Sequence, residues 1–270
     1  ARSANDEGME QEPRTVIQDG RNNYMELTDF TSALSQLPDK LFDFMIFDEC
    51  YMAGAEVAWA LRGYTDHLIV SAAEVVGEGM PYSLILPHLF AENPRLGAGG
   101  VCQAFFEYHD NSDKAADDFL RTATISLFDC NHVDDSFADL VKDILAAYTT
   151  DLELLSPGAN LQHYDRYDTK PLIEGVAVNA NLVFELGDLI NEICPPTDPR
   201  YAALQAKLSQ IIKYSRSTSH LCELPKDISR YTGMTVYIPF KNDTRYTALN
   251  RRYKYNSWYQ RVYPAGYIND

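Results

Sequence analysis

The sequence predicts an α/β fold whose central sheet is mostly parallel. Residues 42–47 form a short, mostly apolar run, which is typical of a strand buried on both faces of such a sheet. Residues 53–62 repeat apolar side chains at helical spacing, and Gly63 stands where a helix is expected to end. A second apolar run covers residues 67–72. This strand–helix–strand succession predicts a right-handed crossover unit, with an active site at the carboxyl ends of the strands.

Further elements are predicted on both sides of this unit. Thr28 is placed to cap a helix over residues 29–37, which Pro38 ends. Beyond the unit, apolar periodicity predicts more helices and strands. The helices cover residues 81–90, 101–109, 134–148 and 201–214, and the strands cover residues 122–128 and 234–239. The first stretch of the chain, up to residue 20 or so, is polar and shows neither period, so we expect no regular structure there.

The charge of the chain limits its partners. The chain has 270 residues and a formal net charge of −16. Binding of nucleic acid depends on clusters of Lys and Arg that displace counterions, so this charge argues against nucleic acid as a partner. Basic peptides are a better match, although acidity also serves simply to keep a protein in solution. The apolar stretch at residues 41–60 is interrupted by acidic side chains, so no membrane span is predicted.

Five cysteines are spread along the chain, at Cys50, Cys102, Cys130, Cys194 and Cys222. They form no CxxC pair and no close spacing with His, so we predict no metal site of the structural zinc type. The acidic residues show no EF-hand spacing. Cysteine use therefore indicates neither a metal centre nor a redox compartment.

Cys50 is the candidate nucleophile. A catalytic cysteine needs a thiolate, surroundings that favour the thiolate and a nearby base, usually His. Cys50 follows the apolar run at residues 42–47 and precedes the predicted helix, whose positive end favours a thiolate. The alternative is an unreactive thiol in the core.

Asp48 is the candidate binding residue beside it. Side chains alternate along a strand, so Asp48 and Cys50 are predicted to project to the same side with Cα atoms about 7 Å apart, and Glu49 to point away. A carboxylate at this separation suits the cationic head of a substrate Arg or Lys while the sulfur reaches the carbonyl carbon. A helix cap is the competing role for Asp48, with equal support from the local sequence.

These residues belong to a longer pattern. Residues 42–82 read FDFMIFDECYMAGAEVAWALRGYTDHLIVSAAEVVGEGMPY. They contain FD-x-C-x-M, an alanine-rich helix, a Val-Ser strand end and G-E-G-x-P-Y, in that order. The pattern resembles the clostripain family of cysteine peptidases, and weaker matches extend the resemblance to most of residues 25–265. Tyr51 and Ala53 depart from the Leu and Gly that are usual in the family.

The resemblance implies a caspase-like α/β sandwich, with a mostly parallel central sheet flanked by helices on both faces. It implies a cysteine endopeptidase with Cys50 as the nucleophile. Asp48 and Glu78 match the acidic positions of the family's S1 pocket, which accounts for cleavage after Arg or Lys. A peptidase that cuts after Asp would need a basic pocket, which these two acids do not fit.

The family's catalytic His precedes the Cys strand, but this chain has no His before Cys50. Its six histidines are expected to be surface or supporting residues, namely His67, His88, His109, His132, His163 and His220. Family members are cleaved between the His and Cys strands, so the resemblance implies that this chain is the heavy chain and that Ala1 is a processed end, preceded by Lys or Arg. The alternatives are an arbitrary chain boundary at Ala1 and a non-catalytic binding module without an assembled dyad.

The resemblance also implies the organisation and the partners of the chain. We expect a flexible processed segment at residues 1–24, a caspase-like catalytic core with the nucleophile strand at residues 25–130, and a remainder at residues 131–270 that packs on the core and extends it. The expected partners are the light chain and protein or peptide substrates with Arg or Lys at P1. The expected location is secreted or at the bacterial cell envelope. We expect no required cofactor, while calcium dependence, which occurs in the family, stays open.

Overall fold

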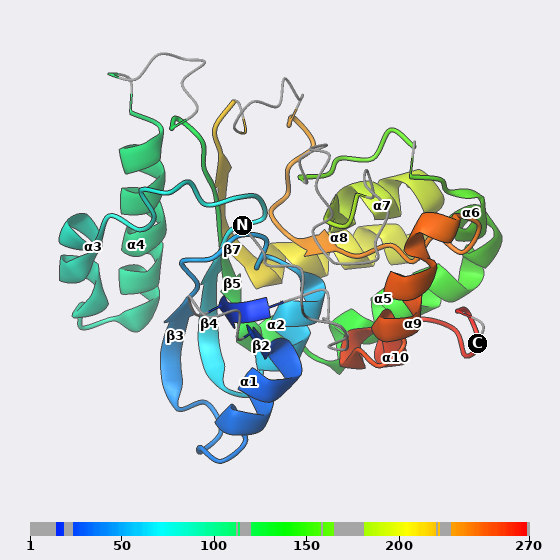
Figure 1. The fold of residues 1–270 in the computed structure, drawn as a ribbon, viewed down its shortest axis with the longest axis horizontal. Helices are drawn as coiled ribbons and strands as arrows, with labels where there is room; N and C mark the ends of the chain where they lie inside the picture. Colours follow the sequence, from blue (N-terminus) through cyan, green and yellow to red (C-terminus); the bar gives the residue numbers. More distant parts are fainter. Residues whose placement is uncertain are drawn as a thin grey trace, which may run out of the picture.

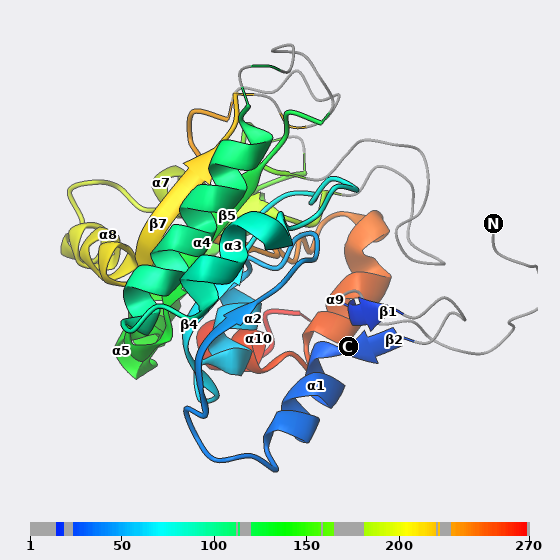
Figure 2. The same cartoon turned by 90° about the vertical axis from the view of Figure 1, so that its left-hand side faces the viewer.

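The computed structural model describes residues 15–18, 24–111, 113, 120–157, 159–164, 181–219, 221 and 228–268. Ala1, His220 and Cys222 lie outside the described residues, as does most of the predicted processed segment. The described part of that segment contains strand β1 (Thr15–Gln18), which pairs antiparallel with β2 (Tyr24–Glu26) beside the first helix (Figure 2). The sequence of this region is polar and shows no period, so no regular structure was expected there, and β1 was missed.

The central sheet is mixed. Its strand order is β3-β4-β5-β7, with bounds β3 Phe42–Ile46, β4 Thr65–Val70, β5 Thr124–Asp129 and β7 Ile212–Ser217. β3 and β4 are parallel, as the crossover unit predicted, but β5 runs antiparallel to both β4 and β7. The prediction of a mostly parallel sheet is therefore wrong for the described strands. Two helices, rather than one, connect β4 to β5, so the chain returns to the edge at which β4 ended and enters β5 from there (Figure 1).

The strand β7 was missed in the sequence. Residues 201–214 were predicted to be one helix, whereas helix α8 (Pro199–Ile211) ends at Ile211 and β7 follows without a loop. The residues of β7 are only partly buried and mostly polar. A strand of this kind shows little alternation of apolar and polar residues. It is stabilised by its antiparallel pairing with β5, which the local sequence does not reveal.

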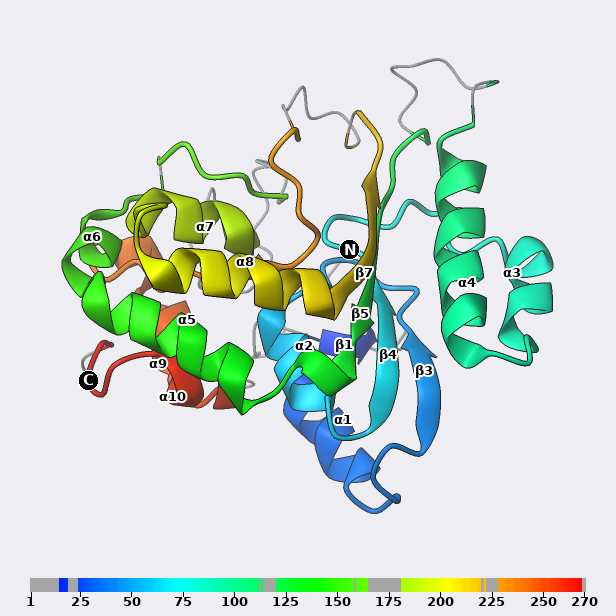
Figure 3. The same cartoon turned by 180° about the vertical axis from the view of Figure 1, so that it is seen from behind.

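Helices cover both faces of the sheet (Figures 1 and 3). Helices α3 (Tyr82–Leu89) and α4 (Pro94–His109) pack on one face, in a cluster that includes Ile69 of β4. The helices α2 (Ala55–Leu61) and α8 lie on the other face, in a second cluster with Leu68 and Val70 of β4. Because neighbouring side chains of a strand point to opposite faces, three consecutive apolar residues of β4 supply both clusters.

The remaining elements pack around α2 and α8. Two short strands, β6 and β8, pair antiparallel, and the N–H of Thr235 in β8 donates to the carbonyl of Ala53 at 2.8 Å. Their bounds and those of the other elements are α1 Leu27–Leu34, η1 Cys130–His132, α5 Asp135–Ala147, α6 Thr149–Leu154, β6 Phe184–Glu185, α7 Leu186–Ile193, β8 Thr235–Val236, η2 Thr244–Tyr246, α9 Thr247–Tyr253 and α10 Ser257–Val262.

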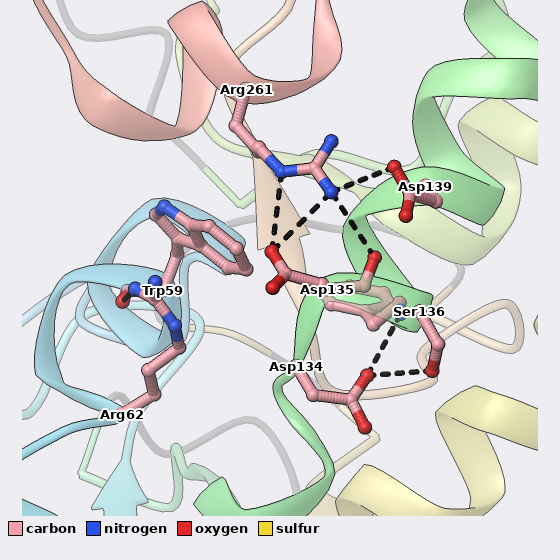
Figure 4. A network of polar contacts seen from close by, with 8 residues as sticks. Trp59, Arg62, Asp134, Asp135, Ser136, Asp139 and Arg261 are labelled. Atoms are coloured by element: carbon pink, nitrogen blue, oxygen red, sulfur yellow. Dashed lines mark hydrogen bonds and ion pairs between the residues drawn. The ribbon is translucent and has the colours of Figure 1, made fainter.

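The C-terminal helix α10 joins α2 to α5. The ring of Trp258 lies between Trp59 of α2, at a centroid distance of 5.7 Å, and Phe137 of α5, at 5.3 Å. Arg261 donates to Asp139 at 2.7 Å and also contacts Asp135, both on α5 (Figure 4). The aromatic tail is therefore part of the core that supports the helix after Cys50.

The close packing of α3 against α4 gives the first prediction. A Cβ added at Gly97 would clash with the backbone carbonyl of His88, whereas a Cβ at Gly99 would meet nothing within 4 Å. Both changes gain the same helix propensity, about 1 kcal/mol, so the difference between them isolates the clash. We expect Gly97→Ala to lower the free energy of unfolding by about 1–3 kcal/mol relative to Gly99→Ala, measured by urea unfolding. Equal stability of the two variants would contradict this packing.

Candidate active site

Cys50 lies in a turn just beyond the carboxyl end of β3. After the strand ends, the N–H of Phe47 still donates to the carbonyl of Ile69 at 3.0 Å. The backbone then turns through Tyr51, whose φ of 60° is in the left-handed region that non-glycine residues seldom adopt. The N–H of Tyr51 donates to the carbonyl of Ala73 at 3.0 Å, so the segment after β4 fixes this turn.

The sulfur of Cys50 contacts the same segment. The backbone N–H of Val75 donates to Cys50 Sγ at 3.3 Å. A donated N–H stabilises a thiolate more than a thiol. Cys50 is half-buried, while the other described thiols, Cys102, Cys130 and Cys194, are buried. Those three thiols lie in the core, whereas Cys50 is more accessible, and its reactivity stays a prediction.

The structure corrects two sequence-based expectations around Cys50. Helix α2 begins at Ala55, after the N-cap Gly54, so Cys50 does not lie at its first turn and the N–H on the sulfur comes from Val75 instead. Extended alternation also ends before Asp48, because β3 stops at Ile46. The prediction that Asp48 and Cys50 share one side cannot rest on strand geometry.

Asp48 is held by the loop that follows β4. Its Oδ2 accepts hydrogen bonds from the N–H of Met80 at 3.3 Å and from the hydroxyl of Tyr82 at 3.0 Å. Asp48 does not cap α2, whose N-cap is Gly54 and has no side-chain hydrogen bond, while its role in binding stays a prediction. The loop between Ser71 and Tyr82 thus contacts Cys50 through Val75 and Asp48 through Met80, and it brings the two residues to one edge of the sheet.

Glu78 lies next to the point where this loop meets Asp48. Gly79 has a φ of +63°, and a Cβ there would lie 3.1 Å from Asp48 Oδ2, so the position requires glycine. The carbonyl of Gly79 can only accept, so His109 must carry its proton on Nε2 to form the 3.0 Å contact. Glu78 itself is exposed. The contact of His109 with Gly79 was not predicted from the sequence, because it joins residues 30 positions apart, and His109 lies at the end of α4.

Thr124 of β5 organises the start of the loop. Its Oγ1 accepts from the N–H groups of Ala72 at 3.1 Å and Ala73 at 2.9 Å, and lies 2.7 Å from the hydroxyl of Ser71. The Ser71 hydroxyl donates to the carbonyl of Ala73, so the Thr124 hydroxyl must donate to Ser71. All four residues are buried. The role of Thr124 was not predicted from the sequence, because Thr124 reaches the start of this loop only through the antiparallel pairing of β4 and β5.

Burial and neighbouring groups shift the pKa values of two side chains at this edge and of two buried thiols elsewhere in the structure. Burial raises the pKa of Glu49; the negative charge of Asp48 adds to this, and the N–H of Cys50 acts in the opposite direction. Burial, followed by the hydrogen bond to Asp48, raises the pKa of Tyr82, so this phenol keeps its proton. Burial raises the pKa of the Cys102 thiol, and that of the Cys130 thiol to about 12, so neither forms a thiolate readily.

The described histidines have other positions. His67 Nδ1 lies 3.0 Å from the carbonyl of Asp43, and His132 lies near Asp129 at 3.9 Å. His67, His109 and His163 are buried, so for these three a surface role is excluded. Across the described ranges, no group of three or more His, Cys, Asp or Glu side chains could hold a metal ion, and no helix is long and apolar enough to cross a membrane.

The contrast among the thiols gives a prediction. With iodoacetamide near pH 8, we expect Cys50 to be modified well before Cys102, Cys130 and Cys194, because it is both accessible and hydrogen-bonded to an N–H. Mass mapping of the peptides reports each site separately. The same reaction in urea should modify all four and serves as the control. Modification of a buried thiol as fast as Cys50 would contradict the assignment.

A second prediction concerns Thr124. Thr124→Val keeps the shape of the side chain but leaves two buried N–H groups without their acceptor, so we expect the free energy of unfolding to fall by about 2–4 kcal/mol. Thr124→Ser keeps the hydroxyl and should stay within about 1 kcal/mol of the parent. Urea unfolding measures both. A Val variant as stable as the Ser variant would show that this hydroxyl does not organise the loop.

Solved structures with this architecture are cysteine proteases. A clostripain from Bacteroides thetaiotaomicron in complex with the peptide inhibitor BTN-VLTK-AOMK has a TM-score of 0.72 and 24% identity, over 91% of this chain and 97% of that one. This likeness shows the fold. An inactive zymogen C11 protease from Parabacteroides distasonis has a TM-score of 0.72 and 27% identity, over 90% of this chain and 64% of that one. A secreted C11 cysteine protease from B. thetaiotaomicron gives 0.70 and 25%, over 88% and 60%.

A search of curated proteins gave no match. This chain spans less than two thirds of the zymogen and of the secreted protease. The model of the Clostripain family, in contrast, matches residues 3–268, which is nearly the whole of the 270-residue chain. The architecture, the position of Cys50 at the sheet edge and this match agree, and the protein belongs to the clostripain family of cysteine proteases.

Proposed function

We propose that this chain is the heavy chain of a two-chain cysteine endopeptidase that cleaves peptide bonds after Arg or Lys. The observation that carries the proposal is the single loop after β4, which contacts both Cys50 and Asp48. A nucleophilic sulfur and a carboxylate that one loop contacts can engage neighbouring parts of one substrate residue. The sulfur would meet its carbonyl carbon, and the carboxylate its cationic head.

In this proposal the reaction is acyl transfer. The Cys50 thiolate attacks the carbonyl carbon of the basic residue, and the resulting tetrahedral oxyanion accepts a hydrogen bond from the backbone N–H of Cys50. The bond to the leaving amine then breaks, and a His of the partner chain gives that amine its proton. Water hydrolyses the thioester and frees the enzyme. Asp48 and Glu78 supply the negative charge that selects Arg or Lys at P1.

The light chain is proposed to add to the edge of β3. Among the described strands β3 pairs with β4 alone, so its second edge has unpaired backbone groups that can accept another strand. Phe44 and Ile46 of β3 are only partly buried. A His at the end of a strand added there would lie beside the turn of Cys50, which completes a caspase-like sandwich and the dyad.

The relatives support further parts of the proposal. The inhibitor of the B. thetaiotaomicron clostripain contains the peptide VLTK, which ends in lysine. The zymogen and the secreted protease are both longer than the part matched here. A precursor of this length could contain a strand that carries the catalytic His. We propose accordingly that cleavage before Ala1 leaves residues 1–24 as a flexible N-terminal segment, that residues 25–130 form the catalytic core and residues 131–270 extend it, and that the enzyme is secreted or at the cell envelope. No cofactor enters the proposed reaction, and calcium has no assigned ligands.

A second candidate is a non-catalytic binding module with the same fold. The absence of any His before Cys50 in the sequence favours it. The two candidates differ in one requirement, because only the peptidase needs a second polypeptide that supplies an imidazole to Cys50.

The proposal predicts the effect of Asp48→Asn. The chain is produced together with its light chain and assayed on peptides with Lys, Arg or norleucine at P1. Loss of the carboxylate should lower kcat/KM for both basic peptides by about 100-fold, because a charged hydrogen bond contributes on the order of 3 kcal/mol, and should leave the norleucine peptide unchanged.

Two variants serve as controls for this assay. Asp29→Asn removes an exposed carboxylate on α1 and should have no effect. Cys50→Ala should abolish cleavage of every peptide. Retention of basic specificity in Asp48→Asn, or cleavage by Cys50→Ala, would contradict the proposed roles, and failure of the two-chain protein to cut any peptide would favour the binding module.

A further inference from the structure

The two oxygens of the Asp48 carboxylate are not equivalent. Oδ2 accepts from the N–H of Met80 and from the hydroxyl of Tyr82. A carboxylate oxygen has two lone pairs, so these two donors fill Oδ2. Among the described residues none donates to Oδ1. Asp48 therefore offers one oxygen, rather than two, to a cation.

The loop that fills Oδ2 is fixed from behind. The imidazole of His109 is fully buried, packs against the ring of Phe105 at a centroid distance of 4.6 Å, and donates to the carbonyl of Gly79. Gly79 in turn approaches the carboxylate so closely that a Cβ would lie 3.2 Å from Oδ1. Met80 and Tyr82 follow directly, so the loop cannot withdraw from Oδ2 without breaking the contact with His109.

Lysine and arginine have different needs at such a carboxylate. The planar guanidinium binds best in a bidentate arrangement, with two parallel N–H groups on two acceptor oxygens. The ammonium group of lysine is a compact charge that one oxygen satisfies. An arginine head would have to displace Tyr82 to reach Oδ2, whereas a lysine head binds Oδ1 with Tyr82 in place.

We propose that Tyr82 makes this site prefer lysine to arginine at P1, by occupying the second oxygen of Asp48. This inference rests on the proposed function, in which Asp48 receives the P1 side chain. Tyr82 acts through Asp48 and is a positioning residue. Glu78, next to Gly79, adds negative charge for either head and does not restore the bidentate geometry at Asp48.

The protonation state of Tyr82 indicates that the preference for lysine does not depend on pH near neutrality. Burial and the hydrogen bond to Asp48 raise its pKa, so the phenol stays protonated and keeps donating through the neutral and mildly basic range. The ratio of lysine to arginine cleavage should therefore not change between about pH 6 and pH 9.

The test compares two peptides that differ only at P1, assayed with the two-chain enzyme. We expect kcat/KM to favour Lys over Arg by about tenfold in the parent, since one charged hydrogen bond separates the two complexes. Tyr82→Phe frees one of the two acceptor positions of Oδ2, while the N–H of Met80 keeps the other, and should reduce this ratio to about one. The change should appear in KM with kcat unaltered, because the cation is bound equally in the ground and transition states.

Tyr255→Phe is the matched control. It removes a hydroxyl from a tyrosine that is 77% exposed between α9 and α10, and the ratio should stay at its parental value. A parent enzyme that favours Arg, or a ratio that Tyr82→Phe leaves within twofold of the parent, would overturn the inference. A general fall in kcat for both peptides, with the ratio kept, would also overturn it, since that is the result of a purely structural role.

A binding measurement separates this inference from the proposed function. The full chain, without a light chain, is titrated with Nα-acetyl-lysinamide and Nα-acetyl-argininamide and followed by NMR. Tighter binding of the lysine compound in the parent, lost in Tyr82→Phe, supports the inference even where neither peptide is cut and the peptidase proposal has failed. Equal affinities for the two compounds in the parent overturn it.

Discussion

The backbone that follows β4 depends on one hydroxyl from the neighbouring strand. The ladder between β4 and β5 ends at the pair Val70–Ser126, and beyond it Thr124 Oγ1 takes the place of a backbone acceptor for Ala72 and Ala73. Buried N–H groups without an acceptor would cost about 1–3 kcal/mol each, so this contact fixes the path of the chain as it leaves the sheet. The loop that begins there reaches Val75, which contacts Cys50, and Met80, which contacts Asp48.

This arrangement leaves the candidate site little freedom to rearrange. Cys50 lies in a turn fixed by the segment after β4, Asp48 is held by the loop after β4, and His109 fixes that loop from the helical layer. A site built on neighbouring strand ends keeps the distance between sulfur and carboxylate nearly constant. In the proposed function, the same contacts let two donors on one carboxylate oxygen influence the choice between lysine and arginine.

Local patterns predicted much of the core. Short apolar runs located β3 and β4, and helical periodicity located α2 and α5, each to within a few residues; their order predicted the parallel pair of β3 and β4. Cys50 and Asp48 were singled out because they follow an apolar run; the strand in that run, β3, is only partly buried, and the roles of the two residues stay predictions. Tyr82 lay within a family motif, but its contact with Asp48 had no local signal. Long-range pairing could not be predicted from local patterns. The position of Thr124 depends on the antiparallel pairing of β4 with β5, and that of β7 on its antiparallel pairing with β5, and both pairings join residues far apart in the sequence.

The most direct test is a crystal structure of the two-chain enzyme after reaction with a chloromethyl ketone that bears lysine. The account predicts a covalent bond to Cys50 Sγ, with the lysine ammonium within about 3 Å of Asp48 Oδ1 and the Tyr82 hydroxyl still on Oδ2. An adduct on another residue, or a lysine head directed away from Asp48, would contradict it.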